Sequence, residues 1–237
     1  MYIDMHNHFV YGVDDGCKTQ EAMEKLLTAL HDDGITKLIS TSHITPSQRH
    51  FPMEDYQAHF AQAQAFVKSQ GWEMELYTGH EILYTDAASR YLREGKALTL
   101  AGSDFTLVEF VPGEKLERMQ EAAQKVRNAG YRPVFAHIER YEAMNNLKHV
   151  RQMKEDFGVR LQVNCHTFVD KQPFLRRRWL GQLIKEQLLD YVSTDTHDMK
   201  GREPCMTRCY QTLEKEFGHD VARSLTWYHA LEFFEDA

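Results

Sequence analysis

The chain has 237 residues, of which 42% are hydrophobic and 27% charged, so it can bury a large core as one barrel-sized domain over residues 1–237. The formal net charge of −7 argues against a nucleic-acid-binding surface, which is normally basic. No basic start precedes an apolar run, and no apolar run reaches about 18 residues, so we expect neither an export signal nor a membrane span. The four cysteines lack the pair spacing of a disulfide framework, which favours a reducing, cytoplasmic setting.

Short β-type runs alternate with amphipathic stretches seven times along the chain. The expected strands are Tyr2–His8, Lys37–His43, Glu73–Ile82, Thr106–Phe110, Pro133–His137, Val159–Cys165 and Asp190–His197. The expected helices lie at about 20–33, 54–70, 115–129, 147–157, 173–188, 204–217 and 219–235. Such repetition predicts an α/β fold with parallel strands and right-handed crossovers. We expect a closed or nearly closed (β/α)7 barrel, and a doubly wound open sheet is the alternative.

Six of the seven expected strands end at, or just after, a side chain that can bind a metal ion. These side chains are His6 and His8, with Asp14 and Asp15 in the following loop, then His43, Glu81, Glu109, His137, Asp195 and His197. The carboxyl ends of parallel barrel strands face one mouth, so these groups should converge there. Residues two apart on a strand point the same way, which pairs His6 with His8 and Asp195 with His197.

Each of these side chains alone has an ordinary structural explanation. Glu81 by itself is typical of a solvated carboxylate, and His137 of a hydrogen-bonded core histidine. Chance does not readily place such residues at the same end of six strands. If these polar and charged groups were buried together without a metal ion, each would lower the free energy of unfolding by several kcal/mol. We therefore expect the set to bind metal.

Imidazole and carboxylate ligands without cysteine suit Mn, Fe, Zn or Mg, and so many candidates imply two or three divalent ions. Such a cluster can convert a bridging water into hydroxide by lowering its pKa from about 15.7 to about 7, and can clamp phosphoryl oxygens. Arg140 and Arg202 follow ligand candidates in loops expected at the mouth, where a guanidinium can grip the remaining phosphate oxygens. Either arginine could instead be an ordinary surface residue.

Several motifs are familiar as a group. Ile3-Asp4-Met5-His6-Asn7-His8 and Gly12-Val13-Asp14-Asp15-Gly16 resemble the opening of the PHP (polymerase and histidinol phosphatase) superfamily. More narrowly, the chain is similar to the bacterial tyrosine-protein phosphatases of capsule and exopolysaccharide gene clusters. The likeness runs from Met1 to about Arg202 through Thr41-Ser42-His43, Gly79-His80-Glu81-Ile82, Val108-Glu109-Phe110, Ala136-His137-Ile138-Glu139-Arg140-Tyr141, Leu161-Gln162-Val163-Asn164 and Ser193-Thr194-Asp195-Thr196-His197.

The resemblance implies a distorted TIM-like (β/α)7 barrel with a trinuclear, manganese-type site. By analogy, one metal would be held by His6, His8, Glu81 and Asp195, a second by Glu81, Glu109 and His137, and a third by Asp15, His43 and His197. Arg140 and Arg202 match the arginines with which the family grips phosphate. The implied reaction is attack of a metal-bridging hydroxide on phosphotyrosine, in the tail of a cytoplasmic polysaccharide-assembly tyrosine kinase.

The chain departs from the family pattern at Tyr11 and Ile138, where proline is usual, and at Thr196, where alanine is common. These departures leave every ligand and both arginines in place, so they bear on substrate preference. We expect Asp4 to orient a ligand, and His80 to point to the strand face opposite Glu81. Tyr11, Phe51 and Tyr141 either border an aromatic substrate or pack locally.

Three other functions remain open at this point. The first is a small-molecule phosphatase of the histidinol-phosphatase type, and the second is a nuclease-type phosphodiesterase, which the acidic balance disfavours. The third is a non-catalytic metal-binding regulatory scaffold, which would not need the two arginines. A thiol-based phosphatase is excluded, because no cysteine is followed by an arginine six positions later.

Overall fold

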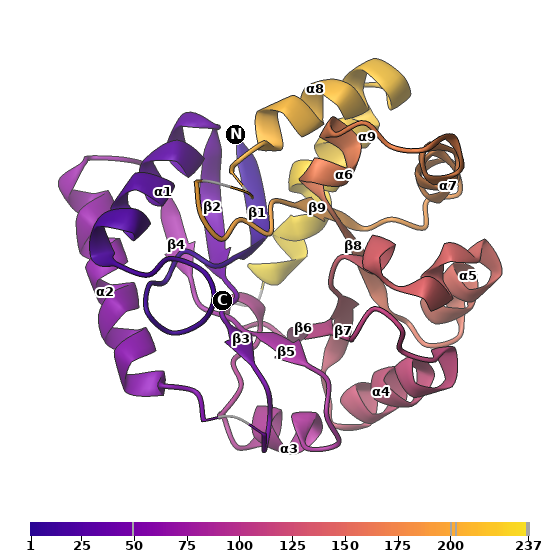
Figure 1. The fold of residues 1–237 in the computed structure, drawn as a ribbon, viewed down its shortest axis with the longest axis horizontal. Helices are drawn as coiled ribbons and strands as arrows, with labels where there is room; N and C mark the ends of the chain where they lie inside the picture. The colour runs from indigo at the N-terminus through magenta and orange to yellow at the C-terminus, as the bar shows by residue number, and fades with distance from the viewer. Residues whose placement is uncertain (49, 200, 202, 236–237) are drawn as a thin grey trace.

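The computed structural model describes residues 1–48, 50–199, 201 and 203–235, with parallel strands at the centre and helices around them (Figure 1). The strands are β1 (Tyr2–Asn7), β2 (Ile35–Ser40), β3 (His43–Ile44), β4 (Glu75–Tyr77), β5 (Glu81–Leu83), β6 (Phe105–Glu109), β7 (Arg132–Phe135), β8 (Arg160–Asn164) and β9 (Tyr191–Ser193). The α-helices are α1 (Gln20–Asp32), α2 (Met53–Ser69), α3 (Ala88–Arg93), α4 (Leu116–Asn128), α5 (Leu147–Glu155), α6 (Cys165–Val169), α7 (Phe174–Lys185), α8 (Met206–Phe217) and α9 (His219–Arg223). Single turns of other helix types lie at Leu100–Gly102, Ile138–Arg140, Glu142–Asn145, Ser224–Tyr228 and His229–Phe233.

The strands form two parallel sheets in the orders β1-β2-β4 and β3-β5-β6-β7-β8-β9. The expected α/β fold with parallel strands is thus confirmed. The first strand also meets the segment after the last one, through a parallel bridge between Asn7 and Thr196. Two backbone hydrogen bonds accompany this bridge, from His8 N to Thr196 O at 3.0 Å and from Asp195 N to His6 O at 2.9 Å. Residues from the two ends of the chain are therefore neighbours.

The second and third expected strands are each interrupted. After β2 the backbone remains bonded to β1, where Thr41 N donates to Asn7 O at 2.7 Å, and β3 then pairs with β5. Between β4 and β5 the chain passes very close to its neighbour, since a Cβ on Gly79 would lie 3.2 Å from Ser40 O. The interruptions fall just before His43 and Glu81, which pair with each other across β3 and β5.

Two strands end two or more residues earlier than the sequence pattern predicts. β7 stops at Phe135 and β9 at Ser193, and the following His137 and Asp195 have left-handed backbones with φ of 30° and 52°. The expectation that Asp195 and His197 extend from one strand is therefore wrong. Their side chains still meet, with His197 Nδ1 3.5 Å from Asp195 Oδ1. A non-glycine residue in this conformation is strained, and such strain concentrates at functional sites.

Helix α1 illustrates why the outer layer forms where it does. Thr19 caps its start by accepting a hydrogen bond from Ala22 N at 3.2 Å. Its buried side chains, Met23, Leu26, Leu27 and Leu30, recur at the spacing of one helix face, and they pack on the core. The helix ends just before Gly34, whose φ of 86° favours a residue without a side chain.

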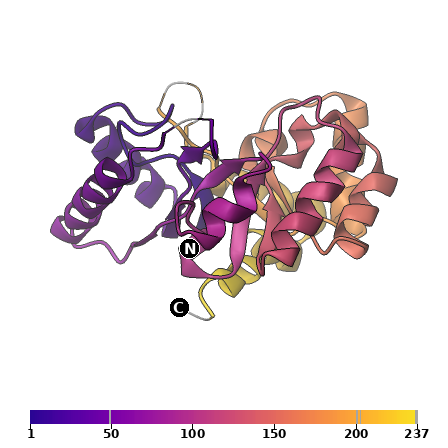
Figure 2. The same cartoon turned by 90° about the horizontal axis from the view of Figure 1, so that it is seen from below.

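A second apolar cluster fills the space between the strands. It joins alternate strand residues such as Ile3, Leu107 and Val134 to Phe233 from the C-terminal segment. The Phe233 ring centre lies 5.0 Å from that of Phe105, and in Figure 2 this yellow segment runs along the lower edge of the strands. One end of the strands is thereby closed by apolar side chains, and the polar groups gather at the other. No helix in the described ranges is long and apolar enough to cross a membrane.

Candidate metal centre

All nine side chains predicted as metal ligands lie together at the carboxyl ends of the strands. Within the described residues the donor atoms of eight of them form three clusters, each with all atoms inside 4.8 Å of one another, and the ninth, His137, lies beside Glu81 and Glu109. The inner cluster is His6, His8, Glu81 and Asp195; the side cluster is His43, Glu81 and Glu109; the outer cluster is His8, Asp15, His43 and His197. The clusters are linked, because Glu81, His8 and His43 each belong to two of them.

The inner cluster is fully buried. Glu81 Oε2 lies 3.1 Å from His6 Nε2 and 3.2 Å from His8 Nε2, and Asp195 Oδ1 lies 3.4 Å from His6 Nε2. Ligand atoms about 2.1 Å from one metal ion lie about 3 Å from each other. The observed spacing is therefore that of donors around a common ion.

The side cluster extends from Glu81 towards the surface. His43 Nδ1 lies 3.1 Å from Glu81 Oε2 and 3.5 Å from Glu109 Oε2. His137 is close by, with its Nε2 2.9 Å from Glu81 Oε1 and 3.3 Å from Glu109 Oε1. The resemblance grouped His137 with the two glutamates, and the structure places His43 beside them as well.

The outer cluster lies at the mouth, where the Asp15 side chain is 64% exposed. Its Oδ1 lies 3.4 Å from His43 Nε2 and 3.3 Å from His197 Nε2. The ring of His8 stacks on that of His197 with centres 3.9 Å apart. The imidazole of His43 thus stands between the side and outer clusters, with one nitrogen facing each.

Hydrogen bonds behind the histidines fix which nitrogen faces inward. His6 Nδ1 lies 3.3 Å from Gln162 Oε1, and His8 Nδ1 lies 2.9 Å from Asp14 Oδ2. Both partners accept hydrogen bonds, so in the neutral ring each Nδ1 carries the proton and each Nε2 presents a lone pair. Without a metal ion, burial opposes charge on His8, but Asp14 and Glu81 outweigh it and hold the pKa of His8 well above its usual range, so a proton occupies that place. Asp14 also accepts from Gly16 N at 2.9 Å, in a turn so tight that a Cβ on Gly16 would lie 2.2 Å from His8 O.

Two further histidines are also held by hydrogen bonds at Nδ1. His197 Nδ1 donates to the Asp195 backbone oxygen at 2.9 Å, which leaves its Nε2 towards Asp15. His137 Nδ1 lies 3.3 Å from the hydroxyl of Tyr141, and its Nε2 faces Glu81. Outer partners of this kind orient metal-binding imidazoles in known sites.

The inner cluster brings hydrogen-bond acceptors against one another. His6 Nε2 and His8 Nε2 are 3.3 Å apart, and in each neutral ring the proton lies on Nδ1, where it faces Gln162 or Asp14. Glu81 Oε2 makes no hydrogen bond, although these two nitrogens lie within 3.2 Å of it. Lone pairs that converge on one buried point need a positive charge there, so these residues fit a divalent metal ion.

The electrostatics of the site favour positive charge. Burial works against the charged form of Glu81, but the imidazoles of His6 and His43 outweigh it, and the pKa of Glu81 is held well below its usual range. Burial likewise opposes the charged form of His137, but the two glutamates beside it raise its pKa to about 10. The carboxylates therefore attract any available cation to this point.

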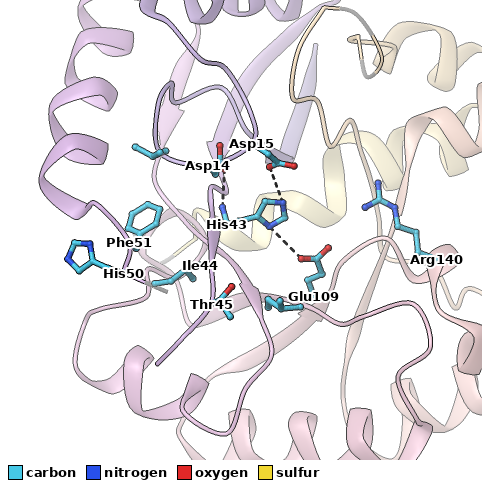
Figure 3. Close-up of a pocket in the computed structure, with 11 residues that line it drawn as sticks. Asp14, Asp15, His43, Ile44, Thr45, His50, Phe51, Glu109 and Arg140 are labelled. Carbon is cyan, nitrogen blue, oxygen red and sulfur yellow. Dashed lines mark hydrogen bonds and ion pairs between the residues drawn. The ribbon is translucent and has the colours of Figure 1, made fainter. Parts of the chain in front are cut away.

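Arg140 stands on the wall of a pocket of about 400 Å³ that opens above the clusters (Figure 3). Its Nη2 lies 2.5 Å from Asp195 Oδ2, and its side chain is 34% exposed. Burial disfavours the guanidinium charge, but Asp195 and Glu139 more than compensate and raise the pKa of Arg140. Arg202, the other predicted phosphate-binding arginine, lies outside the described residues.

Four subsidiary expectations are resolved by the structure. Asp4 accepts hydrogen bonds from Asn7 Nδ2 and from Thr194, so it links β1 to the segment that follows β9. Tyr11 packs locally on His59. Tyr141 is buried beneath His137, whereas Phe51 lines the pocket. His80 lies outside the three clusters and accepts a hydrogen bond from Leu98 N at 3.0 Å.

The sequence reasoning assigned no role to Gln162 or Asn164, and it named Asp14 only as a candidate metal ligand, whereas the structure places Asp14 as the hydrogen-bond partner of His8. Gln162 Oε1 accepts from His137 N at 2.6 Å, and Asn164 Nδ2 donates to Asp195 Oδ2 at 2.7 Å. Two amides at alternate positions of β8, separated by Val163, were a usable signal, because they must share one strand face. No sequence pattern predicted the hydrogen bond between His8 and Asp14.

The family is decided by similarity along nearly the whole chain. The model of the family described as "Capsular polysaccharide synthesis, CpsB/CapC" matches residues 2–235. The chain belongs to the CpsB/CapC family. Among its relatives, tyrosine-protein phosphatase CpsB from Streptococcus pneumoniae is 31% identical over 230 residues, which cover 94% of each chain. Tyrosine-protein phosphatase YwqE from Bacillus subtilis is 24% identical over 226 residues, which cover 94% of this chain and 88% of YwqE. The resemblance found from the motifs is thus confirmed for the CpsB/CapC branch.

Solved structures agree with the CpsB/CapC assignment. A crystal structure from work on YwqE of B. subtilis and CpsB of S. pneumoniae, described as metal-dependent tyrosine phosphatases, superposes with a TM-score of 0.86 at 23% identity. It covers 98% of this chain and 94% of that one. A histidinol phosphate phosphatase from Lactococcus lactis, complexed with Zn, L-histidinol and phosphate, gives a TM-score of 0.57 at 14% identity over 90% of this chain and 93% of its own. These likenesses concern the fold.

Proposed function

We propose that this member of the CpsB/CapC family is a metal-dependent protein-tyrosine phosphatase. The observation that carries the proposal is the convergence of acceptor atoms from His6, His8 and Glu81 on one buried point beneath an arginine-lined pocket. Curated relatives named as tyrosine-protein phosphatases support the substrate. The proposed partner is a phosphotyrosine protein of capsular polysaccharide synthesis, specifically the tail of a tyrosine kinase, and the proposed location is the cytoplasm.

We propose that this donor set binds two or three divalent ions, Mn by preference and otherwise Fe, Zn or Mg. His6, His8, Glu81 and Asp195 would hold the first. Glu81, Glu109 and His137, with His43 beside them, would hold the second, and Asp15, His43 and His197 the third. When bound, such ions lower the pKa of water from about 15.7 to about 7 and neutralise charge on phosphoryl oxygens.

The residues around the pocket would divide the remaining work. Asp14 and Gln162 hold the rings of His8 and His6 in place through their Nδ1 atoms. Arg140 would bind phosphate oxygens with its planar fork and stabilise their charge as the ester bond breaks. The leaving phenol has a pKa of about 10, so it departs with less help from a proton donor than an alkyl alcohol does. We retain Arg202 as a second phosphate-binding residue.

We also propose that the strands form one (β/α)7 barrel within a single domain, residues 1–237. In this scheme β2 with β3, and β4 with β5, are each one interrupted strand, which gives seven strands in chain order. Support comes from the continuous parallel pairing of β5 to β9 and from the bridge between Asn7 and Thr196.

The test is hydrolysis by the purified protein with and without metal. With Mn²⁺ it should hydrolyse phosphotyrosine peptides and p-nitrophenyl phosphate, and EDTA should abolish both activities. Iodoacetamide should have little effect, because all four cysteines are buried and none lies in the site. Turnover of L-histidinol phosphate far above that of phosphotyrosine peptides would overturn the substrate assignment. Activity that survives EDTA would overturn the metal dependence.

A further inference from the structure

The pocket above the clusters has two chemically different sides. Its polar side is Asp15, His43, Glu109 and Arg140, with Asp14 behind them. Its other side carries the apolar side chains of Val13, Ile44, Phe51 and Leu83, which we call the apolar wall, and Thr45 and His50 complete the lining beside Ile44 and Phe51. In Figure 3, Ile44 and Phe51 lie on the side opposite Arg140, with His43 and Glu109 between them. A volume of about 400 Å³ is within the range of about 300–1,000 Å³ for small-molecule sites.

Two of the four residues of the apolar wall, Ile44 and Leu83, lie on strands that also carry ligands, whereas Val13 and Phe51 lie in loops. Ile44 directly follows His43 on β3 and is only 3% exposed. Leu83 stands two residues after Glu81 on β5, so their side chains leave the same strand face. The positions of Ile44 and Leu83 relative to the clusters are therefore set by the strand pairing of β3 with β5.

Phe51 is held in the wall by neighbours from other segments. Its ring meets that of His80 edge to face, with centres 4.5 Å apart and planes at 71°, and it lies 5.5 Å from the ring of Tyr56. His80 Nδ1 accepts the hydrogen bond from Leu98 N, so this ring nitrogen is unprotonated and the imidazole is neutral. Phe51 thus rests on an uncharged aromatic support.

The two sides together define the occupant. Cations at the clusters and the Arg140 guanidinium attract the dianionic end of a phosphate monoester. The apolar wall gains by covering itself with a flat, apolar group attached to that phosphate. An alkyl phosphate such as phosphoserine offers only a single methylene to the wall.

We propose that the apolar wall is the subsite for the aryl ring of an aryl phosphate monoester, and that Phe51 is its specificity-determining residue. This inference rests on the proposed function and deepens it. The wall distinguishes aryl from alkyl esters by contact with the group that carries the phosphate, whereas the clusters and Arg140 bind the phosphate of either.

The experiment compares phenylphosphonate with methylphosphonate, whose P–C bonds resist hydrolysis, by titration calorimetry on Mn²⁺-loaded protein. Wild type should bind phenylphosphonate about three- to tenfold more tightly than methylphosphonate. In Phe51→Ala this preference should fall towards one, with methylphosphonate affinity and metal content unchanged. Phe66→Ala is the matched control, because Phe66 packs on Trp72 outside the pocket, and it should keep the preference. A preference that persists in Phe51→Ala, or an equal loss for both ligands, would overturn the proposal.

A second variant protects the test against misfolding. Val13→Thr places a hydroxyl in the wall with almost no change of shape, and it should also weaken phenylphosphonate binding selectively. If wild type prefers phenylphosphonate but does not hydrolyse phosphotyrosine peptides, the proposed function fails and the subsite stands. If wild type hydrolyses them and Phe51→Ala keeps the same ratio of rates on phosphotyrosine and phosphoserine peptides, only the subsite fails.

Discussion

Glu81→Gln removes a single negative charge at the point where two metal clusters meet. Glu81 belongs to the inner and side clusters, whereas Glu109 belongs to the side cluster alone. Glutamine keeps the shape of the side chain, but its amide group places N–H donors where His6 Nε2 and His8 Nε2 converge. Glu109→Gln makes the same chemical change in one cluster only, so the two variants form a matched pair.

The expected loss follows from this membership. Glu81→Gln alters two of the three clusters and leaves one intact, whereas Glu109→Gln alters one and leaves two intact. An ion present at about 100 times its Kd stabilises the folded chain by about 2.7 kcal/mol. In a protein of this size 1 kcal/mol shifts the melting temperature by about 2–4 °C, so each occupied site adds about 5–11 °C. Glu81→Gln should therefore forfeit about twice the metal-dependent rise in melting temperature that Glu109→Gln forfeits.

The assay combines elemental analysis of Mn²⁺-loaded, desalted protein with thermal melts in Mn²⁺ and in EDTA. Glu21→Gln, on the exposed face of α1, controls for the substitution itself and should match wild type. Equal metal content in Glu81→Gln and Glu109→Gln would refute the idea that Glu81 is shared between ions. So would a melting temperature of wild type that does not respond to EDTA.

Three other variants separate orientation, chemistry and stability. Asp14→Ala removes the acceptor behind His8 Nδ1 and should weaken metal binding about 10–100-fold, measured by competition with a chelator; unchanged affinity would contradict the orienting role. Arg140→Ala should lower kcat/KM on phosphotyrosine peptide about 100-fold while metal content stays at the wild-type level, and parallel loss of metal would instead assign Arg140 to the support of Asp195. Asp33→Ala removes the carboxylate that accepts hydrogen bonds from the first two backbone N–H groups of α8, and should lower the free energy of unfolding in urea by about 1–2 kcal/mol without affecting metal binding.

Much of the fold was readable in the sequence because strand and helix periods differ along this chain. The alternation gave every strand position, but not the interruptions before His43 and Glu81, where the backbone changes partner. Nor did it give α3 or α6, since helices of five or six residues depend on tertiary contacts more than on periodicity. The early ends of β7 and β9 were equally hidden, because nothing local marks His137 or Asp195 for a left-handed backbone.

The ligand candidates could be predicted because parallel strands bring their carboxyl ends together whatever the details of register. The groups that orient them could not be predicted so easily. Gln162 meets His6 across 156 residues of sequence, and Asn164 meets Asp195 through a left-handed turn that has no sequence signature. Such pairings depend on how strands lie side by side, and one sequence does not specify that at the level of single hydrogen bonds.

The most direct measurement is anomalous diffraction at the manganese edge from crystals grown with excess Mn²⁺. The account predicts anomalous peaks within the clusters, the strongest coordinated by His6, His8, Glu81 and Asp195, and at least one neighbour that shares Glu81. A map without peaks at Glu81, or with His6 and His8 turned away from each other, would contradict it.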